Sequence, residues 1–420
     1  MHIPTLNKMR TKLLILVMIF FCSCGRKSTN ETSNTDSVLE IDLLSAPEST
    51  FKELSDFAEN IEYIPLQTTE SSLIGPFTLK ILNIDNKIYI QNGGLEGEIL
   101  CFDINGKFNF KINNRGRGPE EYDFVSDFDI SSDNKILTIL SSSTRKLVAY
   151  GISDTGFTFK KSLTLKDPAP WSVRLVPGTD KVFMAIPAWI GTEPTLSLLI
   201  NLAGDTIQFK PNCYKYNRIQ LGQGGSRSKE WLAYSAGNLV CFKEVCSDTV
   251  FYVDAKDYSF KPRIIFDTHG TFFTPEMKAG SEKMKNNTTF IPNIFETSRY
   301  VFYWYYTVIV EQNIVNLYGF LFDKKTGTKY KFDVGEDRKI KLKDDISGGP
   351  DFEIEYQENQ SSSGKLFSLV EALALKKYVA GEDFINAKVS DPKKKNELKK
   401  LADSLEETDN PVLIVVTPKD

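Results

Sequence analysis

Residues 113–122 hold the residue types best suited to chemistry and read Asn-Asn-Arg-Gly-Arg-Gly-Pro-Glu-Glu-Tyr. Arg115 and Arg117 alternate with glycine, so two guanidinium groups and the nearby backbone N–H groups could bind a carboxylate or a phosphate. Three polar residues follow that could contact a hydroxyl-bearing ligand: Glu120, Glu121 and Tyr122. The stretch is not a P-loop, because the Gly-Lys-Ser/Thr ending and the following helix are missing. These five side chains form the candidate ligand site.

The same stretch also has a structural interpretation, as a connection between two strands. The arginines would then pair with Glu120, Glu121 or Asp123, and the glycines would satisfy turn geometry. The sequence leaves both interpretations open.

Aromatic residues offer a second kind of binding chemistry. Trp171, Trp189 and Trp231 fall near predicted strand ends or in loops, where an exposed ring could stack on a ligand. Packing is the simpler role for each of them. Residues 299–306 hold six aromatic side chains in eight positions, which favours packing between two layers of sheet over a sugar site.

Histidine chemistry is scarce in this chain. His2 and His269 are the only histidines, and His2 lies in a segment that we expect to be removed. One remaining histidine cannot build a His-rich zinc or iron centre, so we expect no metal and no cofactor. His269 could act as a base beside Asp267, but no nucleophile motif accompanies it, and a histidine in a turn is the favoured interpretation.

The N-terminus predicts export. Three basic side chains come first: Lys8, Arg10 and Lys12. The apolar run at 13–21 has nine residues, too few for a helix to span a bilayer of about 30 Å but suitable for a secretory signal. Cys-Ser-Cys-Gly then resembles a bacterial lipobox with Cys24 as the lipidated residue, although Phe21 replaces the usual aliphatic residue. We predict a lipoprotein signal peptide at 1–24, with a soluble secreted protein as the alternative.

Composition narrows the class of protein. The 420 residues are 41% hydrophobic and 12% aromatic, enough to build large cores. Residues 25–37 contain no apolar side chain to bury and are predicted to be a disordered tether. Loss of the three basic residues with the signal peptide leaves 48 basic and 55 acidic side chains, a net charge of −7. This mild acidity gives no reason to expect a nucleic-acid partner. The later cysteines are predicted to be mainly buried free thiols: Cys101, Cys213, Cys241 and Cys246.

From residue 77 onward, polar turns separate apolar runs with period-two alternation, a pattern typical of β-hairpins. One marker from the second turn of each unit gives spacings of 49, 50, 52 and 70 residues: Asn105, Asp154, Gly204, Lys256 and Thr326. A four-stranded unit repeated about every fifty residues predicts β-propeller blades. Five marked units and the irregular region after residue 336 predict an all-β fold over 38–420. The predicted fold is a six-bladed β-propeller of four-stranded antiparallel blades.

The remaining segments are assigned around this ring. The long interval predicts an excursion from the fifth blade at 267–298, as a loop or a short helix. Residues 366–379 suit either a strand or a helix, and leucines at helical spacing predict a C-terminal helix at 393–407. Strands at 38–41 and 61–64 are left over at the front, and we expect them to pair with the strand at 411–416 and close the ring. 

Four stretches, taken in order, resemble a known family: 57–66, 113–122, 247–251 and 410–413. The chain resembles the six-bladed β-propeller lipoproteins of the Bacteroides group, related in fold to NHL-repeat propellers, over about residues 38–418. It departs at Glu120, where the family usually has glycine. The resemblance implies a propeller fold and a cell-envelope address, but no established activity.

These observations favour a non-enzymatic envelope lipoprotein that binds a ligand or a protein partner. We expect it at the outer membrane, on the periplasmic side or the cell surface, held in the membrane by lipid on Cys24. A glycan, a peptide or an envelope protein could be the partner. The alternative is a glycan or peptide lyase or hydrolase that uses Asp/Glu, Tyr and Arg in the propeller channel, which carboxylates converging on the axis would favour.

Overall fold

The computed structural model describes residues 38–76, 80–94, 97–214, 231–354, 360–361 and 364–420. These residues belong to one compact unit, Val38–Asp420. The predicted signal peptide, the tether and Cys24 lie outside the described residues. No helix among the described residues is long and apolar enough to cross a membrane.

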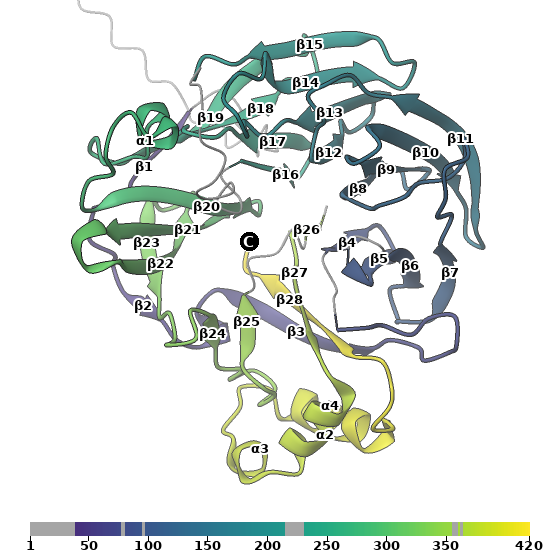
Figure 1. Cartoon of the computed structure of the whole chain (residues 1–420). Coiled ribbons are helices and arrows are strands. Elements are labelled where there is room, and N and C mark those ends of the chain that lie inside the picture. Colours follow the sequence, from purple (N-terminus) through teal and green to yellow (C-terminus); the bar gives the residue numbers. More distant parts are fainter. Residues whose placement is uncertain (1–37, 77–79, 95–96, 215–230, 355–359, 362–363) are drawn as a thin grey trace, which may run out of the picture. The chain divides into compact units, whose positions relative to one another are not determined.

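Five sheets each contain four consecutive antiparallel strands. Blade one consists of β4 (Lys80–Ile84), β5 (Lys87–Asn92), β6 (Glu98–Asp103) and β7 (Phe108–Ile112); blade two of β8 (Asp127–Ile130), β9 (Ile136–Ser141), β10 (Lys146–Ile152) and β11 (Phe157–Thr164); blade three of β12 (Ser172–Leu175), β13 (Lys181–Ala185), β14 (Thr195–Asn201) and β15 (Thr206–Pro211). The first strand of each blade lies toward the centre of the ring and the fourth at its rim (Figure 1).

The next two blades repeat this order and add one strand each. Blade four consists of β16 (Leu232–Ala236), β17 (Leu239–Lys243), β18 (Thr249–Val253) and β19 (Phe260–Asp267); blade five of β20 (Thr288–Glu296), β21 (Tyr300–Ile309), β22 (Ile314–Asp323) and β23 (Thr328–Phe332). The N-terminal strands β1 (Leu39–Asp42) and β2 (Thr50–Phe51) pair in parallel with the rim strands β19 and β23. All five marker residues of the sequence pattern lie in or beside the turn between the third and fourth strands of a blade.

The sixth blade joins the two ends of the chain. Its sheet contains β27 (Leu366–Val370), β28 (Val412–Pro418) and β3 (Ala58–Pro65), and β25 (Phe352–Ile354) lies beside β27. β28 pairs with β27 on one side and with β3 on the other, so the predicted closure by residues 61–64 is confirmed. The same expectation for residues 38–41 is wrong, because β1 extends blade four instead.

Six hydrophobic clusters lie between neighbouring blades, including one between blades six and one. Because successive side chains of a strand point to opposite faces of the sheet, one strand contributes residues to two of these clusters. In β21, Tyr300, Phe302 and Trp304 face blade six, whereas Val301 and Tyr303 face blade four. This two-sided burial explains the aromatic run and confirms that it is core. The described residues therefore form a closed six-bladed β-propeller.

The helices lie in two insertions. α1 (Pro275–Ala279) interrupts the connection between blades four and five, as predicted, but β20 already begins at Thr288 inside the predicted excursion. Between β27 and β28 lie α2 (Ala372–Val379), α3 (Glu382–Asn386) and α4 (Pro392–Ser404). The ambiguous segment 366–379 is thus a strand followed by a helix, and the predicted C-terminal helix is α4. Leu375, Leu398 and Ala402 pack these helices against Val412 of blade six.

Smaller elements complete the described chain. They are η1 (Leu54–Asp56), η3 (Val310–Gln312), β24 (Ile340–Leu342), which pairs with β25, and β26 (Gln360–Ser361), which pairs in parallel with β4. The four cysteines after the tether are free thiols, as predicted. Cys101 and Cys241 are buried, but Cys213 is exposed and Cys246 is only partly buried. Burial raises the pKa of the Cys101 thiol to about 11, which makes it unreactive at neutral pH.

Candidate functional site

Antiparallel order places two sets of loops on one side of the propeller. These are the connections between successive blades and the loops between the second and third strands of each blade. We call this side the loop face. It carries the predicted ligand segment 113–122 and the segments that hold Trp171, Trp189 and Trp231.

The predicted ligand segment is held in a defined shape by its own side chains and backbone. The Glu121 carboxylate accepts the backbone N–H of Gly118 at 2.7 Å and lies against Gly116, where a Cβ would overlap it. Gly116 N–H also donates to the Tyr122 carbonyl at 2.9 Å. Neither glycine has a positive φ, so close approach of a carboxylate explains them better than turn geometry does.

Besides Glu121, two more members of the predicted set have structural contacts. Tyr122 is buried between blades one and two, and its hydroxyl donates to the Ile112 carbonyl at 3.0 Å. The Glu120 side chain is exposed, while its carbonyl accepts the Tyr150 hydroxyl at 2.6 Å. Lys146 donates to the carbonyl of Glu121. The loop is therefore anchored to blade two through its backbone.

Arg115 and Arg117 are the exposed cations of this anchored loop. Their neighbour Asp123 accepts hydrogen bonds from Ser141, the last residue of β9, and from Ser143 and Thr144 in the loop between β9 and β10. Partial burial alone would raise the pKa of Asp123, but these three hydroxyls hold it below its ordinary value. The carboxylate thus stays ionised and fixes one end of the arginine loop to blade two.

The same network continues toward blade three. Ser142 donates to the Pro170 carbonyl at 2.6 Å, next to Trp171. Trp171 and Trp189 have ring centroids 5.6 Å apart, and Trp189 and Trp231 are also 5.6 Å apart. Trp171 is 37% exposed and Trp189 is 36% exposed. We call these three rings the tryptophan row. Their convergence is a finding that the sequence did not predict.

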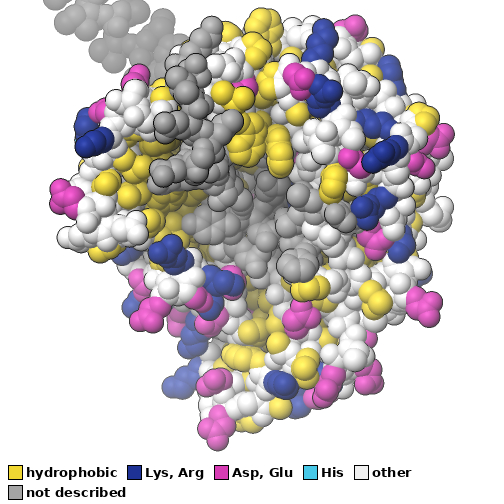
Figure 2. Space-filling model, in the orientation of Figure 1, with side chains coloured by type: hydrophobic (Ala, Val, Ile, Leu, Met, Phe, Trp, Pro, Cys, Tyr) yellow, Lys and Arg dark blue, Asp and Glu magenta, His cyan; other side chains and the backbone are white. Residues whose placement is uncertain are grey.

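The tryptophan row lies near the axis. Trp171 directly precedes β12, and Trp231 directly precedes β16, which are the first strands of blades three and four. Figure 2 shows hydrophobic side chains gathered over the inner strands of these two blades. The row is therefore formed where two adjacent blades bring together segments that are far apart in the sequence.

Buried polar groups hold the loop that carries Trp189. Glu193 is only 7% exposed, and its two carboxylate oxygens accept the backbone N–H groups of Ile190 and Gly191 at 2.8 and 2.7 Å. Asn212 is also buried and donates to the Gly191 carbonyl at 3.1 Å. Neither residue was predicted from the sequence. A glutamate two positions after Gly191 is the sequence signal that could have found the first, because such a side chain can accept the backbone N–H groups of its own turn.

A second polar cluster lies on the inner strands. Asp127 accepts the Lys80 ammonium at 2.6 Å, the Arg174 guanidinium at 2.6 Å and the Val173 N–H at 2.8 Å. All three ionised side chains are at most 2% exposed. Burial alone would raise the pKa of Asp127, but Arg174 and Lys80 hold it below its ordinary value. We call Lys80, Asp127 and Arg174 the axial charge cluster.

The axial charge cluster links the first strands of four blades, because Arg174 also donates to the Ala233 carbonyl in β16 at 2.6 Å. Lys80 and Asp127 are 47 residues apart, and so are Asp127 and Arg174. This blade-length spacing is the signal that sequence analysis overlooked. Nearby Asp129 accepts the Leu175 N–H at 2.7 Å, and burial raises its pKa. Asp127 and Asp129 thus bring carboxylates toward the axis, as the enzyme alternative requires. The Asp127 carboxylate, however, already accepts hydrogen bonds from Lys80, Arg174 and the Val173 N–H.

His269 lies in a turn, as the sequence favoured. Its φ is 51°, and its Nε2 lies 2.9 Å from an Asp42 carboxylate oxygen and 3.7 Å from Asp267. The hydrogen bond to Asp42 raises the pKa of His269 above its ordinary value. The described residues contain no group of three or more His, Cys, Asp or Glu side chains able to hold a metal ion.

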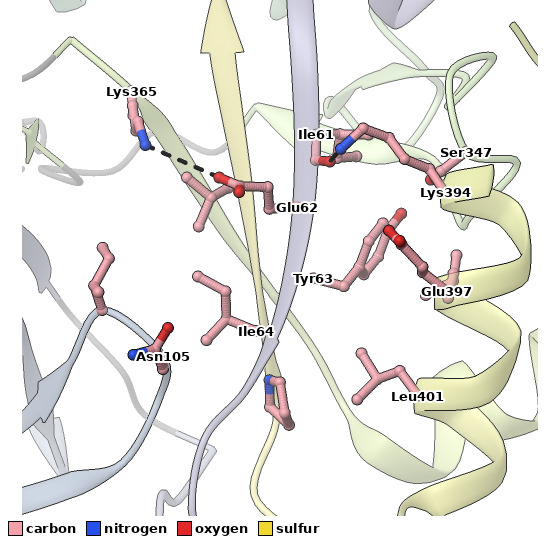
Figure 3. Close-up of a pocket in the computed structure, with 14 residues that line it drawn as sticks. Ile61, Glu62, Tyr63, Ile64, Asn105, Ser347, Lys365, Lys394, Glu397 and Leu401 are labelled. Atoms are coloured by element: carbon pink, nitrogen blue, oxygen red, sulfur yellow. Dashed lines mark hydrogen bonds and ion pairs between the residues drawn. The ribbon is translucent and has the colours of Figure 1, made fainter. Parts of the chain in front are cut away.

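A cavity of about 450 Å³ lies between β3 and α4 (Figure 3). Lys394 donates to the Ile61 carbonyl at 3.0 Å, and Glu62 lies 3.9 Å from Lys365. The Tyr63 hydroxyl donates to a buried carboxylate at 3.0 Å. The Lys394 contact joins α4 to β3, and the other two contacts occupy polar groups of β3, so the cavity offers less available chemistry than the loop face does.

Comparison with known proteins gives a family and a fold. A family model described as "Domain of unknown function (DUF4934)" matches residues 39–417. A crystal structure of a Bacteroides fragilis protein, which its name describes as exported, is 18% identical to this chain with a TM-score of 0.62. The match covers 91% of this chain and 100% of that one. The RRP9 WD40 repeats are 9% identical with a TM-score of 0.39, and the match covers 86% and 99% of the two chains. No curated protein matches the sequence.

Proposed function

This chain belongs to the DUF4934 family, and from that premise we propose that it is an exported lipoprotein whose propeller binds a ligand through the loop face without catalysis. Lipid on Cys24 holds it in the outer membrane, on the periplasmic side or the cell surface. The name of its Bacteroides structural relative supports export, and the lipobox-like sequence supports lipidation.

One observation carries the binding proposal. On the loop face, exposed side chains stand on loops whose backbones are held by polar groups from the same face. Arg115 and Arg117 project from a loop held by the Glu121 carboxylate, and Trp189 projects from a loop held by the Glu193 carboxylate. Preorganised loops lose little conformational entropy when a ligand binds, which favours affinity.

A channel enzyme has less support. Both oxygens of the Asp127 carboxylate are occupied, one by Lys80 and the other by Arg174 and the Val173 N–H. A carboxylate held in this way is a poor general base, because proton uptake would leave two buried cations without a counter-charge. His269 is exposed in a turn and lies beside two carboxylates rather than a nucleophile.

Membrane fractionation tests the lipoprotein part of the proposal. In a bacterial host that processes lipoproteins, the wild-type chain should partition with membranes and require detergent for release. Cys24→Ala should yield soluble or unprocessed protein, whereas Cys22→Ala, two residues earlier, should remain lipidated. Membrane retention and normal cleavage of the Cys24→Ala chain would overturn this part.

Anion binding tests the arginine loop. Citrate is the probe, because its carboxylates match two guanidinium forks. The double variant Arg115→Ala/Arg117→Ala should bind citrate roughly tenfold more weakly, with an unchanged melting temperature. Arg338→Ala removes an exposed arginine outside this loop and should leave citrate binding unchanged. A large loss of melting temperature in the double variant would instead assign the arginines a structural role.

A further inference from the structure

We propose that the tryptophan row is a carbohydrate site that takes a twisted glycan chain rather than a flat one. The inference rests on the proposed ligand-binding function and names the class of ligand for one part of the loop face.

The chemistry of the row favours a sugar. An indole ring has an apolar face and a polar N–H edge, so it suits a ligand with both apolar C–H faces and hydroxyl edges. A pyranose ring has that combination. In the loop that carries Trp189, the described residues offer one other exposed large hydrophobic side chain, Ile190. A stable protein partner would need a broader contact, on the order of 1,000 Å² in total.

The angles between the rings indicate the shape of the chain. The planes of Trp171 and Trp189 meet at 68°, and those of Trp189 and Trp231 meet at 66°. Successive rings therefore turn their faces by similar large angles. A flat glycan ribbon presents its sugar faces in nearly one plane and can follow only one of these rings. A glycan that rotates from one sugar to the next can present faces to more than one.

The row is positioned before any ligand arrives. The backbone N–H of Trp171 donates to the Ala185 carbonyl at 2.9 Å, and the Trp231 side chain packs beside the core between blades three and four. Trp189 follows Ala188, which is buried in a small cluster with Leu196 and Val245. Together with the carboxylate of Glu193, these contacts fix the backbone beneath each ring. A preorganised aromatic site of this kind binds without a large ordering cost.

Fluorescence supplies a direct readout, because the chain has four tryptophans and the fourth, Trp304, is buried between blades five and six. Quencher-accessible emission therefore comes from the row. Maltoheptaose and laminarihexaose serve as twisted probes, and cellohexaose serves as the flat probe. Each is titrated into the mature chain, with calorimetry alongside, and acrylamide quenching is measured with and without glycan.

We expect at least one twisted probe to bind and to shield the row from acrylamide, and cellohexaose to bind at least tenfold more weakly. Trp171→Ala/Trp189→Ala should weaken binding by tenfold or more, with little change in melting temperature. As single substitutions, Trp189→Tyr should weaken glycan binding less than Trp189→Ala does. Phe209→Ala, which truncates another exposed aromatic residue on β15, should bind as the wild type does.

Three results would overturn the inference: no binding of any glycan, binding of cellohexaose as tight as that of the twisted probes, or unchanged glycan affinity in the double tryptophan variant. None of them decides the proposed function. Citrate binding through Arg115 and Arg117 and membrane retention through Cys24 are measured separately and would still support it. Glycan binding lost only in the arginine variant would keep the loop face as the site and remove the tryptophan row.

Discussion

The axial charge cluster and the tryptophan row both gather side chains from separate blades, yet they use them in opposite ways. Asp127 and Arg174 are 2% and 0% exposed, and their charged atoms are joined to each other and to the backbone. Trp171 and Trp189 are more than a third exposed, and it is the backbone beneath them that is held. Polar chemistry thus stabilises the ring in one region and positions a surface in the other.

The difference has a physical cause. A charge taken out of water is tolerated only when it is paired, so the members of the axial charge cluster depend on one another and have little freedom to bind anything else. A neutral indole that is more than a third exposed carries no charge that must be paired, so its removal costs the fold less than the loss of one of these charges. Substitutions should therefore change stability in the first region and binding in the second.

The largest expected effect comes from breaking ring closure. β28 pairs with both β27 and β3, and Val412, Leu413 and Val416 are fully buried. Deletion of residues 411–420 removes the central strand of this sheet, and we expect no cooperatively folded protein by circular dichroism and calorimetry. Removing only Lys419 and Asp420, which are exposed, is the matched control and should have a small effect. A soluble product of the longer deletion with an unchanged melting curve would show that β28 is peripheral.

The second-largest effect should come from the axial charge cluster. Asp127→Asn leaves Lys80 and Arg174 buried without their counter-charge and should lower the free energy of unfolding by about 3–5 kcal/mol in urea denaturation. Asp337→Asn, in an exposed ion pair with Lys341, should change it far less, because water screens that pair. Equal effects of the two substitutions would mean that the axial pairing does not stabilise the ring.

A smaller effect should come from Glu193, a buried carboxylate that supports the tryptophan row. Glu193→Gln replaces one acceptor oxygen with an N–H₂ group that faces a backbone donor, at a cost of about 1–3 kcal/mol in unfolding free energy. Glycan affinity should fall together with stability, because the loop that carries Trp189 loses its support. Glu336→Gln at an exposed position is the control. Unchanged acrylamide quenching and unchanged glycan affinity in Glu193→Gln would separate this carboxylate from the tryptophan row.

The smallest effect concerns pH. The hydrogen bond that the His269 imidazole makes to the Asp42 carboxylate raises the pKa of His269, so the protonated form is favoured in the folded chain. Its stabilising contribution is therefore fully present below the unfolded-state pKa, about 6.5, and is lost as the pH rises through the folded-state pKa. A chain made without residues 1–24 contains His269 as its sole histidine, which gives one imidazole signal to titrate by NMR. Asp42→Asn should lower its pKa, and a value unaffected by that substitution would contradict the assignment.

Much of the fold was predictable from sequence, because hairpin turns are local. The turns marked by Asn105 and Thr326 are set by Asp and Gly within a few residues, and their spacing predicts the blades. The position of β1 was not predictable, since a short parallel strand at a rim depends on which edge is free nearby. A strand of four residues carries no signal for that choice.

The site was less predictable for a related reason. The sequence left two roles open for Glu121, contact with a ligand or a structural contact within its own loop. In the structure its carboxylate accepts the backbone N–H of Gly118. Trp171 and Trp231 are 60 positions apart, and only the neighbouring positions of blades three and four bring them together around Trp189. Which indole rings meet, and at what angles, therefore depends on how the propeller places its blades and not on any local sequence pattern.

Thermal unfolding with and without glycan tests the central claim most directly. A ligand that binds only the folded chain stabilises it by about 2.7 kcal/mol at a concentration 100 times its Kd. At such a concentration, the tighter-binding twisted probe should raise the melting temperature of the wild type and of Asp127→Asn alike, although the latter starts lower. It should stabilise Trp171→Ala/Trp189→Ala, which starts near the wild type, by at most about half as much, because a tenfold weaker Kd leaves the probe at only about ten times the Kd of that variant. An equal rise in the double tryptophan variant would contradict the account.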